Sequence, residues 1–281
     1  MLLNIQNNLA MPKSLNIKYN NKIVSKESNN CSFTGQFLSD IPSQKIHPQL
    51  FGIKVNKTTF KGLGANTKIA RETVQEFHKE LGFLHSDSFI QLKIYKHRQD
   101  KKFEPINQKL GVIAKKYANE VGDVMYKQQM ELFSTDMPEH QITEQLKLYV
   151  KEAHAGNCDQ QAEILQEELK KKGISARNLN FRILNKADDQ MRECGGHSFD
   201  VIGMDKNADI QNPDSWGVNA VIADSWANIS EPAPTGLKYL KEIFDFNPET
   251  EYLIFDDKDL LRQNLIKAFS DLRKTLNDVN S

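Results

Sequence analysis

The stretch AGNCDQQAEILQEELKKKG, residues 155–173, predicts a helix that begins at a cysteine. Asn157 is a favourable N-cap residue, and Asp159 places negative charge at the positive end of the helix dipole. Three lysines and then Gly173 end the helix. Cys158 shares one face of this helix with three apolar residues: Ala162, Leu165 and Leu169. The sequence therefore places a thiol at a helix N-terminus and directs it towards the core.

After this helix the hydrophobic pattern changes from helical to alternating. Short segments rich in Ile, Val and Phe are separated by polar or glycine-containing connections, as is typical of strands. The expected strands are ISARNLNFRIL (174–184), HSFDVIGM (197–204), VNAVIADSW (218–226) and EYLIF (251–255). Helical spacing returns over residues 260–272 and predicts a final helix. Together these segments predict an α+β fold.

Helical spacing of apolar residues also precedes the cysteine. It predicts helices over residues 66–81, 105–133 and 139–153. The third of these helices would be opened by a capping box from Asp136 to Glu139.

The first 64 residues differ in composition from the rest of the chain. Eight asparagines fall within the first thirty positions, and neither a helical nor a strand period is sustained. Such a segment cannot bury enough apolar surface to offset its ordering entropy. We therefore expect a largely disordered leader over 1–64, a helical region over 65–135 and an α+β catalytic domain over 136–281.

Composition excludes several classes of protein. The 37 Lys and Arg residues balance 37 Asp and Glu residues, which argues against a dedicated nucleic-acid binder. Three cysteines are too few and too far apart for a disulfide framework or a CxxC metal site, and there is no HExxH motif. The chain lacks both the apolar core of a cleavable signal and a transmembrane run. We expect no metal, no cofactor, no nucleic acid and no membrane partner.

Three separate residues could together form a nucleophilic site. A helix N-terminus favours the thiolate form of a cysteine, which is the nucleophile. A nucleophilic thiol also needs a base, and the base needs an orienting group. If the strands of His197 and Asp224 are neighbours, the imidazole can lie between that carboxylate and the thiol of Cys158. Each residue alone also has a structural explanation: a small buried hydrophobe, a hydrogen-bonded core histidine and a turn or cap aspartate.

Two other residues are rivals for these roles. Cys194 lies three residues before His197, too close for attack by that base from the usual direction, and no helix begins there. Asp200 lies three positions after His197 and therefore on the opposite face of the strand, where we expect it at the surface.

The order of four short motifs resembles a known superfamily. GNC before a helix, KKKGISAR after it, GGHSF on a strand and ADSW at the end of the next resemble the transglutaminase-like and papain-like Cys-His-Asp enzymes. The motifs are also similar to bacterial effector and toxin glutamine deamidases on that fold. The resemblance covers about residues 140–230 and implies a central helix, beginning at the cysteine, packed on an antiparallel sheet. It implies Cys158 as nucleophile, His197 as general base and acid, and Asp224 as the orienting acid.

The oxyanion hole departs from the papain pattern. Glu152 occupies the place, six residues before the cysteine, where papain-type enzymes have a glutamine. The backbone N–H of Cys158 can supply one donor. Candidates for the second are Gln145, Gln141 and the side chain of Asn157.

Other residues are expected at the rim of the site. His154 is either a helix cap or a rim residue, and Trp226 either packs or shields the Asp–His bond from water. The segment MDKNADIQNPDSWG (204–217) is expected to form a long loop beside the site.

The expected chemistry is acyl transfer on side-chain carboxamides of a protein substrate, with glutamine deamidation favoured because the resembling effectors are deamidases. A cysteine protease or transglutaminase with the same triad, and an inactive binding module on this fold, are the alternatives. Residues 66–153 lie largely outside the resemblance and are expected to bind the substrate or another protein. A polar leader without a classical signal favours a cytoplasmic protein or one delivered by a specialised secretion system.

Overall fold

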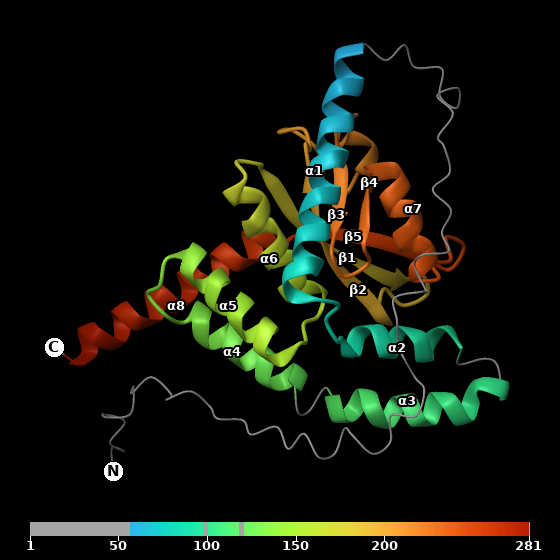
Figure 1. Ribbon diagram of the computed structural model, residues 1–281. Coiled ribbons are helices and arrows are strands. Elements are labelled where there is room, and N and C mark those ends of the chain that lie inside the picture. Colours follow the sequence, from blue (N-terminus) through green and yellow to red (C-terminus); the bar gives the residue numbers. More distant parts are fainter. Residues whose placement is uncertain (1–56, 98–100, 118–120, 281) are drawn as a thin grey trace. The chain divides into compact units, whose positions relative to one another are not determined.

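The computed structural model describes residues 57–97, 101–117 and 121–280 (Figure 1). Within them the helices are α1 (Lys57–Leu81), α2 (Asp87–Lys96), α3 (Glu104–Tyr117), α4 (Asp123–Phe133), α5 (Glu139–Ala153), α6 (Cys158–Lys171), α7 (Ala233–Ile243) and α8 (Lys258–Asn280). Two 3₁₀ turns are η1 (Lys101–Phe103) and η3 (Pro213–Ser215). The strands are β1 (Ala176–Asn185), β2 (Met191–Ile202), β3 (Val221–Asp224), β4 (Ile229–Pro232) and β5 (Glu251–Asp257).

The strands form one antiparallel sheet in the order β4-β3-β2-β1-β5. The described chain is therefore an α+β protein, as the change of hydrophobic period predicts. The sequence pattern predicts four of these strands and misses β4. That strand spans only residues 229–232 and ends in a proline, so it carries no alternating signal.

The strand that carries His197 is bent just before that residue. His197 lies opposite Phe181 of β1, but the register shifts between Arg182 and Leu184. On β2 the extra residues include Cys194, whose φ of 55° lies in the left-handed region. A bulge of this kind breaks the ladder and redirects the strand, so it helps to fix where the imidazole points.

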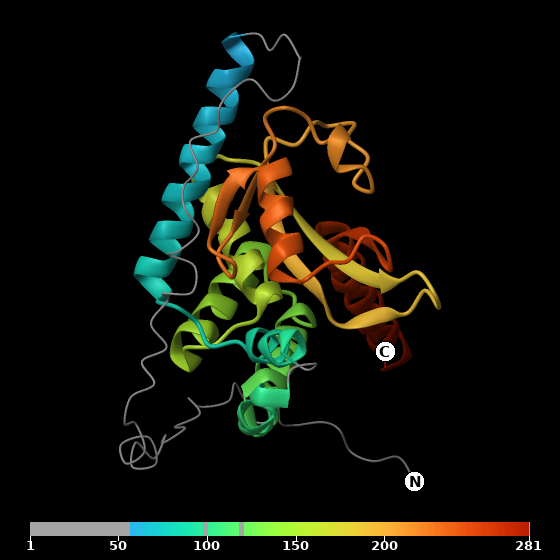
Figure 2. The same cartoon turned by 90° about the vertical axis from the view of Figure 1, so that its right-hand side faces the viewer.

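Helices cover both faces of the sheet, as Figure 2 shows for α1 and α7 on opposite sides of β3 and β4. Val221 of β3 packs in the core that includes side chains of α1 and α6. Ile222 faces α7, and a Cβ at Gly236 would come within 3.0 Å of it. Because side chains alternate along a strand, Asp224 shares the face of Ile222. His197 lies on that same face of β2, with the residues that pack against Ile222.

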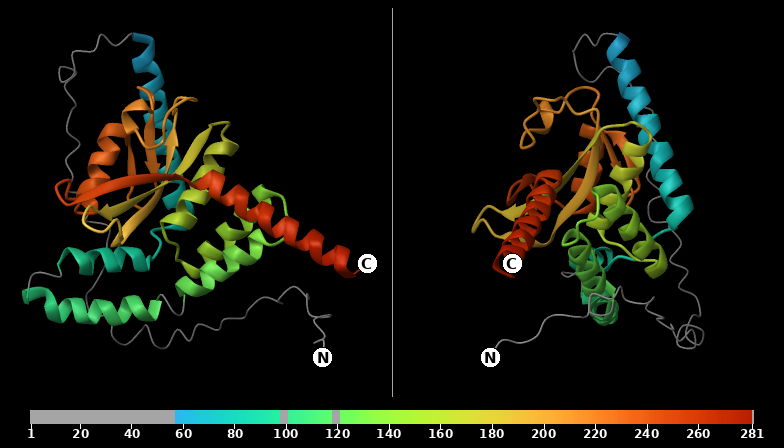
Figure 3. Two further views of the ribbon diagram at one scale, coloured as in Figure 1. Left: turned by 180° about the vertical axis from the view of Figure 1, so that it is seen from behind. Right: turned by 90° about the vertical axis from the view of Figure 1, so that its left-hand side faces the viewer.

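β5 leads directly into α8, which supports the helix that begins at the cysteine (Figure 3). Leu265 and Phe269 of α8 pack against the core formed by α4, α5 and α6. Gln166 of α6 donates to the two carboxylate oxygens of Asp259 at 2.8 and 3.0 Å.

The helix α1 is part of the same packed unit as the sheet. Its buried core residues are Ala70, Val74, Phe77 and Leu81. Asn66 donates a hydrogen bond to the main chain of Asn219 at 2.8 Å. Residues 57–64, expected in the leader, are helical because Leu63 extends the packing of α1 against the core. Residues 1–56 of the expected leader lie outside the described residues.

Several helices differ from the sequence expectation. The helix expected over 105–133 is two helices, α3 and α4, and residues 118–120 are not described. The N-cap of α5 is Pro138, whereas Asp136 pairs with Arg273 of α8. The sequence pattern does not predict α2 or α7, because α2 lacks an apolar stripe and α7 begins among prolines and a glycine. Within the described residues, no helix combines the length and the apolar character needed to cross a membrane.

Candidate active site

Cys158 is the first residue of α6, and it is partly exposed. Asn157 caps the helix with extended backbone (φ −81°, ψ 177°) and forms a capping box with Gln160. In that box the Asn157 N–H donates to Gln160 Oε1 at 2.9 Å. His154, which is exposed, ends α5 in the left-handed region with φ of 48°. The turn between α5 and α6 thus places the thiol at the positive end of a helix dipole.

His197 and Asp224 are hydrogen-bonded and almost completely buried. Nε2 of the imidazole lies 2.6 Å from Oδ2 of the carboxylate, and each side chain is 1% exposed. The other carboxylate oxygen accepts the Ala227 N–H at 2.9 Å. Nδ1 of His197 is buried without a hydrogen-bond partner among the described residues, so it is the nitrogen left for the Cys158 thiol.

The environment favours the protonated form of His197, whose pKa is raised from 6.5 to about 10. Burial of the ring acts to lower this pKa, but the charge and hydrogen bond of Asp224, followed by those of Cys158, outweigh it. The thiol therefore lies within interaction range of the imidazole. At neutral pH the ring is an imidazolium, which stabilises a thiolate beside it.

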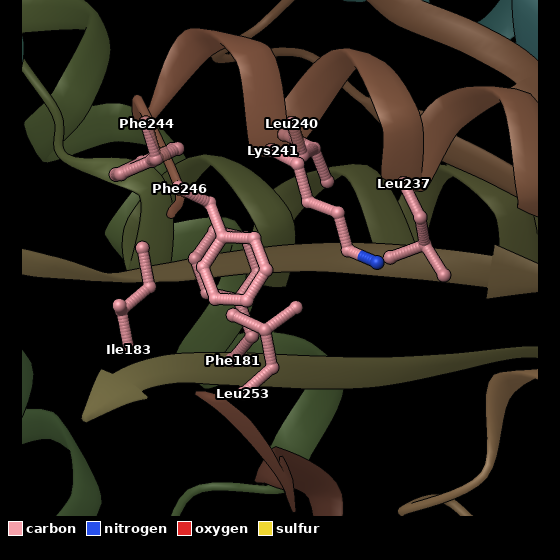
Figure 4. A pocket seen from close by; sticks show the side chains of 8 residues that line it. All are labelled: Phe181, Ile183, Leu237, Leu240, Lys241, Phe244, Phe246 and Leu253. Carbon is pink, nitrogen blue, oxygen red and sulfur yellow. The ribbon is translucent and has the colours of Figure 1, made fainter. Parts of the chain in front are cut away.

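Aromatic rings surround the imidazole. The ring centroids of Trp226, Phe244 and Phe181 lie 4.8, 5.3 and 5.7 Å from that of His197. Phe181 and Phe244 also line the apolar pocket between α7 and the strands β1 and β5 (Figure 4). Lys241 is the one charged side chain in the pocket lining. The residues of this pocket therefore pack beside the imidazole, and their apolar side chains offer few hydrogen-bonding groups for a carboxamide.

A polar contact ties the start of α6 to the strand of the histidine. Ser198, next to His197, donates a hydrogen bond to Asp159, next to Cys158. Lys258 of α8 pairs with the same carboxylate at 3.1 Å. Burial acts to raise the pKa of Asp159, but the charge of Lys258 and these hydrogen bonds lower it overall. The carboxylate beside the thiol is thus partly neutralised by a lysine.

Ser86 belongs to the site, although no sequence pattern singles it out. It lies directly before α2, is 6% exposed, and donates from Oγ to Asn157 Oδ1 at 2.8 Å. Trp226 Nε1 donates to the Ser86 Oγ at 3.1 Å. Main-chain hydrogen bonds between His85 and residues 154–156 hold this segment beside the turn that precedes Cys158. Trp226 and Asn157 are therefore brought together at the rim.

The structure does not bring Gln145 or Gln141 to the thiol. Lys171, in the last turn of α6, pairs with Glu144 of α5. Lys147 of α5 likewise pairs with Glu168, so the part of α5 that carries Gln145 lies beside the second half of α6 instead of its first residue. The backbone N–H of Cys158 and the side chain of Asn157 are the expected oxyanion donors that lie at the thiol.

Asp200 is not the surface residue that the sequence predicts. It lies on the face opposite His197, as expected, but helices cover that face and the side chain is 0% exposed. Neither carboxylate oxygen has a hydrogen-bond partner among the described residues. Burial, with the nearby charges of Asp259 and Asp224, raises the pKa of Asp200 well above 3.8. The environment therefore disfavours the ionised form of this acid.

The loop between β2 and β3 lies away from the site. It joins Ile202 to Val221, the pair at the far end of the strands from Asp224. His197 precedes Ile202 by five residues, which is about 17 Å along a strand. The loop instead packs through Trp216, which is 0% exposed. Its expected position beside the site is therefore wrong.

The described residues include no group of three or more His, Cys, Asp or Glu side chains arranged to hold a metal ion. No family model, curated protein or solved structure matches the chain. The chemistry of the site is accordingly inferred from its own geometry.

Proposed function

We propose that the protein is a thiol-dependent acyl-transfer enzyme that acts on side-chain carboxamides of proteins, as a glutamine deamidase. The observation that carries the proposal is the buried hydrogen bond between His197 and Asp224, which leaves Nδ1 of the imidazole for Cys158 at the start of α6. The motifs over residues 140–230 resemble transglutaminase-like and papain-like enzymes. A helix that begins at the cysteine and packs on adjacent antiparallel strands is compatible with the core of that superfamily.

In the proposed reaction the Cys158 sulfur attacks the carboxamide carbon, and the carbonyl electron pair moves to oxygen. The C–N bond then breaks, and the His197 imidazolium gives its proton to the nitrogen, so that ammonia leaves. Neutral His197 next takes a proton from water as the water oxygen attacks the thioester. The S–C bond breaks and the thiolate–imidazolium pair is restored. The net change is amide plus water to acid plus ammonia.

The first test compares two thiols of the same chain. Cys194 is also partly exposed, but it lies in a strand bulge instead of at a helix start. Iodoacetamide should alkylate Cys158 much faster than Cys194 at mildly acidic pH, as read by peptide mass spectrometry. His197→Ala should remove the difference. Equal rates in the parent protein would overturn the proposal.

The second test identifies the reaction. A library of glutamine-containing peptides is incubated with the parent protein or Cys158→Ala in water enriched in heavy oxygen. Deamidation predicts conversion of Gln to Glu with one heavy oxygen in the side chain, only with the parent. Peptide cleavage would instead identify a protease, and amine-dependent crosslinks a transglutaminase, because all three use the same thiol, base and acid.

A further inference from the structure

We propose that Asn157 Nδ2 is the second oxyanion donor and that Ser86 is a positioning residue that aims it. The inference rests on the proposed function, because an oxyanion forms only if Cys158 attacks a carbonyl carbon. It assigns a role to Ser86, which belongs to none of the motifs that resemble the superfamily.

The hydrogen bonds of Asn157 fix which end of its amide is free. Oδ1 accepts from Ser86 Oγ at 2.8 Å, and the capping box turns the side chain towards the backbone N–H of Gln160. A backbone N–H requires an acceptor, so the amide oxygen must lie on that side. Nδ2 makes no hydrogen bond among the described residues, and it belongs to the residue that directly precedes Cys158.

The direction of the Ser86 hydroxyl is fixed in turn by Trp226. An indole N–H can only donate, and Trp226 Nε1 donates to Ser86 Oγ at 3.1 Å. The hydroxyl proton is therefore left to point at Asn157 Oδ1. Ser86 is 6% exposed, so water competes little for either bond. The three side chains form a chain of hydrogen bonds with one defined direction.

Ser86 does not make the hydrogen bond that is usual for a serine at a helix N-cap. It is the N-cap of α2 with extended backbone (φ −142°, ψ 126°), where a serine oxygen usually accepts a hydrogen bond from the first turn of its own helix. Ser86 makes no such bond. Its hydroxyl donates instead to Asn157, in the turn that precedes Cys158. A residue that forgoes its usual local bond for a distant one is a candidate for function.

The chemistry uses both donors in one step. When Sγ bonds to the carbonyl carbon, the electron pair of the double bond moves onto oxygen. The Cys158 N–H and Asn157 Nδ2 would both donate to that oxygen. Donors fixed before the reaction stabilise such charge more than mobile ones, because they need no reorganisation.

The test compares two reagents that react with the same thiol. Acylation of Cys158 by p-nitrophenyl acetate builds an oxyanion before nitrophenolate leaves. Alkylation by iodoacetamide displaces iodide from a saturated carbon and builds none. The ratio of the acylation rate to the alkylation rate therefore measures stabilisation by the oxyanion hole. A change in the thiolate population alters both rates equally and leaves the ratio unchanged. No protein substrate is needed.

We expect Asn157→Ser, which keeps an N-cap oxygen but loses Nδ2, to lower this ratio about 10²-fold. Ser86→Ala should lower it about 10-fold through loss of one orienting hydrogen bond, and Ser86→Thr, which keeps the hydroxyl, should restore most of it. Trp226→Phe should lower it less, and it replaces Ser86→Ala if that variant fails to fold. Thermal unfolding of each variant is the control for folding.

Three results would overturn parts of the scheme separately. An unchanged ratio in Asn157→Ser would remove the donor assignment alone. Equal loss of acylation and alkylation in Ser86→Ala would make Ser86 a structural residue. A parent protein whose Cys158 is acylated no faster than Cys194 would overturn the proposed function, and the donor assignment with it.

Discussion

Arg192 of β2 and Glu251 of β5 form an ion pair that is almost fully withdrawn from solvent, with side chains 4% and 7% exposed. Nη1 of the arginine lies 3.0 and 3.1 Å from the two carboxylate oxygens and 3.2 Å from the Asp245 carbonyl oxygen. The pair locks the bulged part of β2, just before His197, to the chain that follows α7.

Removing one partner of this pair should be strongly destabilising. Glu251→Gln would leave the Arg192 charge buried without its counter-ion, so we expect the free energy of unfolding to fall by about 3–5 kcal/mol. Urea unfolding at neutral pH measures the change. The matched control is Glu72→Gln in the exposed pair of Lys68 and Glu72, with side chains 74% and 53% exposed. That change should stay within about 0.5 kcal/mol, and similar effects of the two variants would contradict the prediction.

The titration of His197 should depend on Asp224. In the parent protein, NMR of labelled histidine should show no titration of His197 near pH 6.5, because its pKa is raised to about 10. Asp224→Asn removes the largest cause that raises this pKa, so the pKa should fall because burial is then opposed mainly by Cys158. Titration of His197 near pH 6.5 in the parent would contradict the prediction.

The pairing of His197 with Asp224 should also make the free energy of unfolding depend on pH. The folded-state pKa of His197 exceeds the unfolded value of 6.5. Its contribution to the free energy of unfolding is therefore complete below pH 6.5 and is lost as the pH rises through about 10. Asp224→Asn should abolish this alkaline loss, which urea unfolding at several pH values would reveal.

Asp200→Asn should stabilise the protein at neutral pH. The folded-state pKa of Asp200 lies well above 3.8, so its favourable contribution is complete below pH 3.8 and is lost as the pH rises. Each unit by which the pKa is raised corresponds to about 1.4 kcal/mol. The gain from Asp200→Asn should therefore grow from pH 4 to pH 8. Asp214→Asn, at an exposed position, is the control and should show no such trend.

Lys258 should protect the reactivity of the thiol. Lys258→Met leaves the Asp159 carboxylate next to Cys158 without its 3.1 Å partner, and that negative charge disfavours a thiolate. We expect alkylation of Cys158 at pH 6 to slow by about two- to fivefold, less at high salt, because the pair is partly exposed. The double variant with Asp159→Asn should recover the rate. A double variant as slow as Lys258→Met would show that the effect is not electrostatic.

The parts of the site that could be predicted from the sequence are those set by local rules. Capping and dipole signals place Cys158 at the start of α6, and strand alternation places His197 and Asp224 on one face of the sheet. These signals need only a few neighbouring residues. His197 and Asp224 are hydrogen-bonded to each other, while the catalytic roles of all three residues stay predictions.

Other features depend on tertiary contacts that no short window contains. Ser86 reaches Asn157 across 71 positions, so neither residue carries a local signal of the bond. Asp200 looks like a surface residue because alternation assigns it a face but cannot say what covers that face. Gly236 signals a loop, yet α7 uses it to pack closely against Ile222.

The hydrogen bond from Trp226 to Ser86 spans 140 positions of the chain. During synthesis the cysteine emerges before the strands that bring the imidazole and the carboxylate, so a growing or unfolded chain carries only an ordinary thiol. In the proposed scheme the thiol becomes reactive only when the chain has folded far enough for both ends of this span to meet. The alkylation rate of Cys158 would then report whether residues 86 to 226 have folded together.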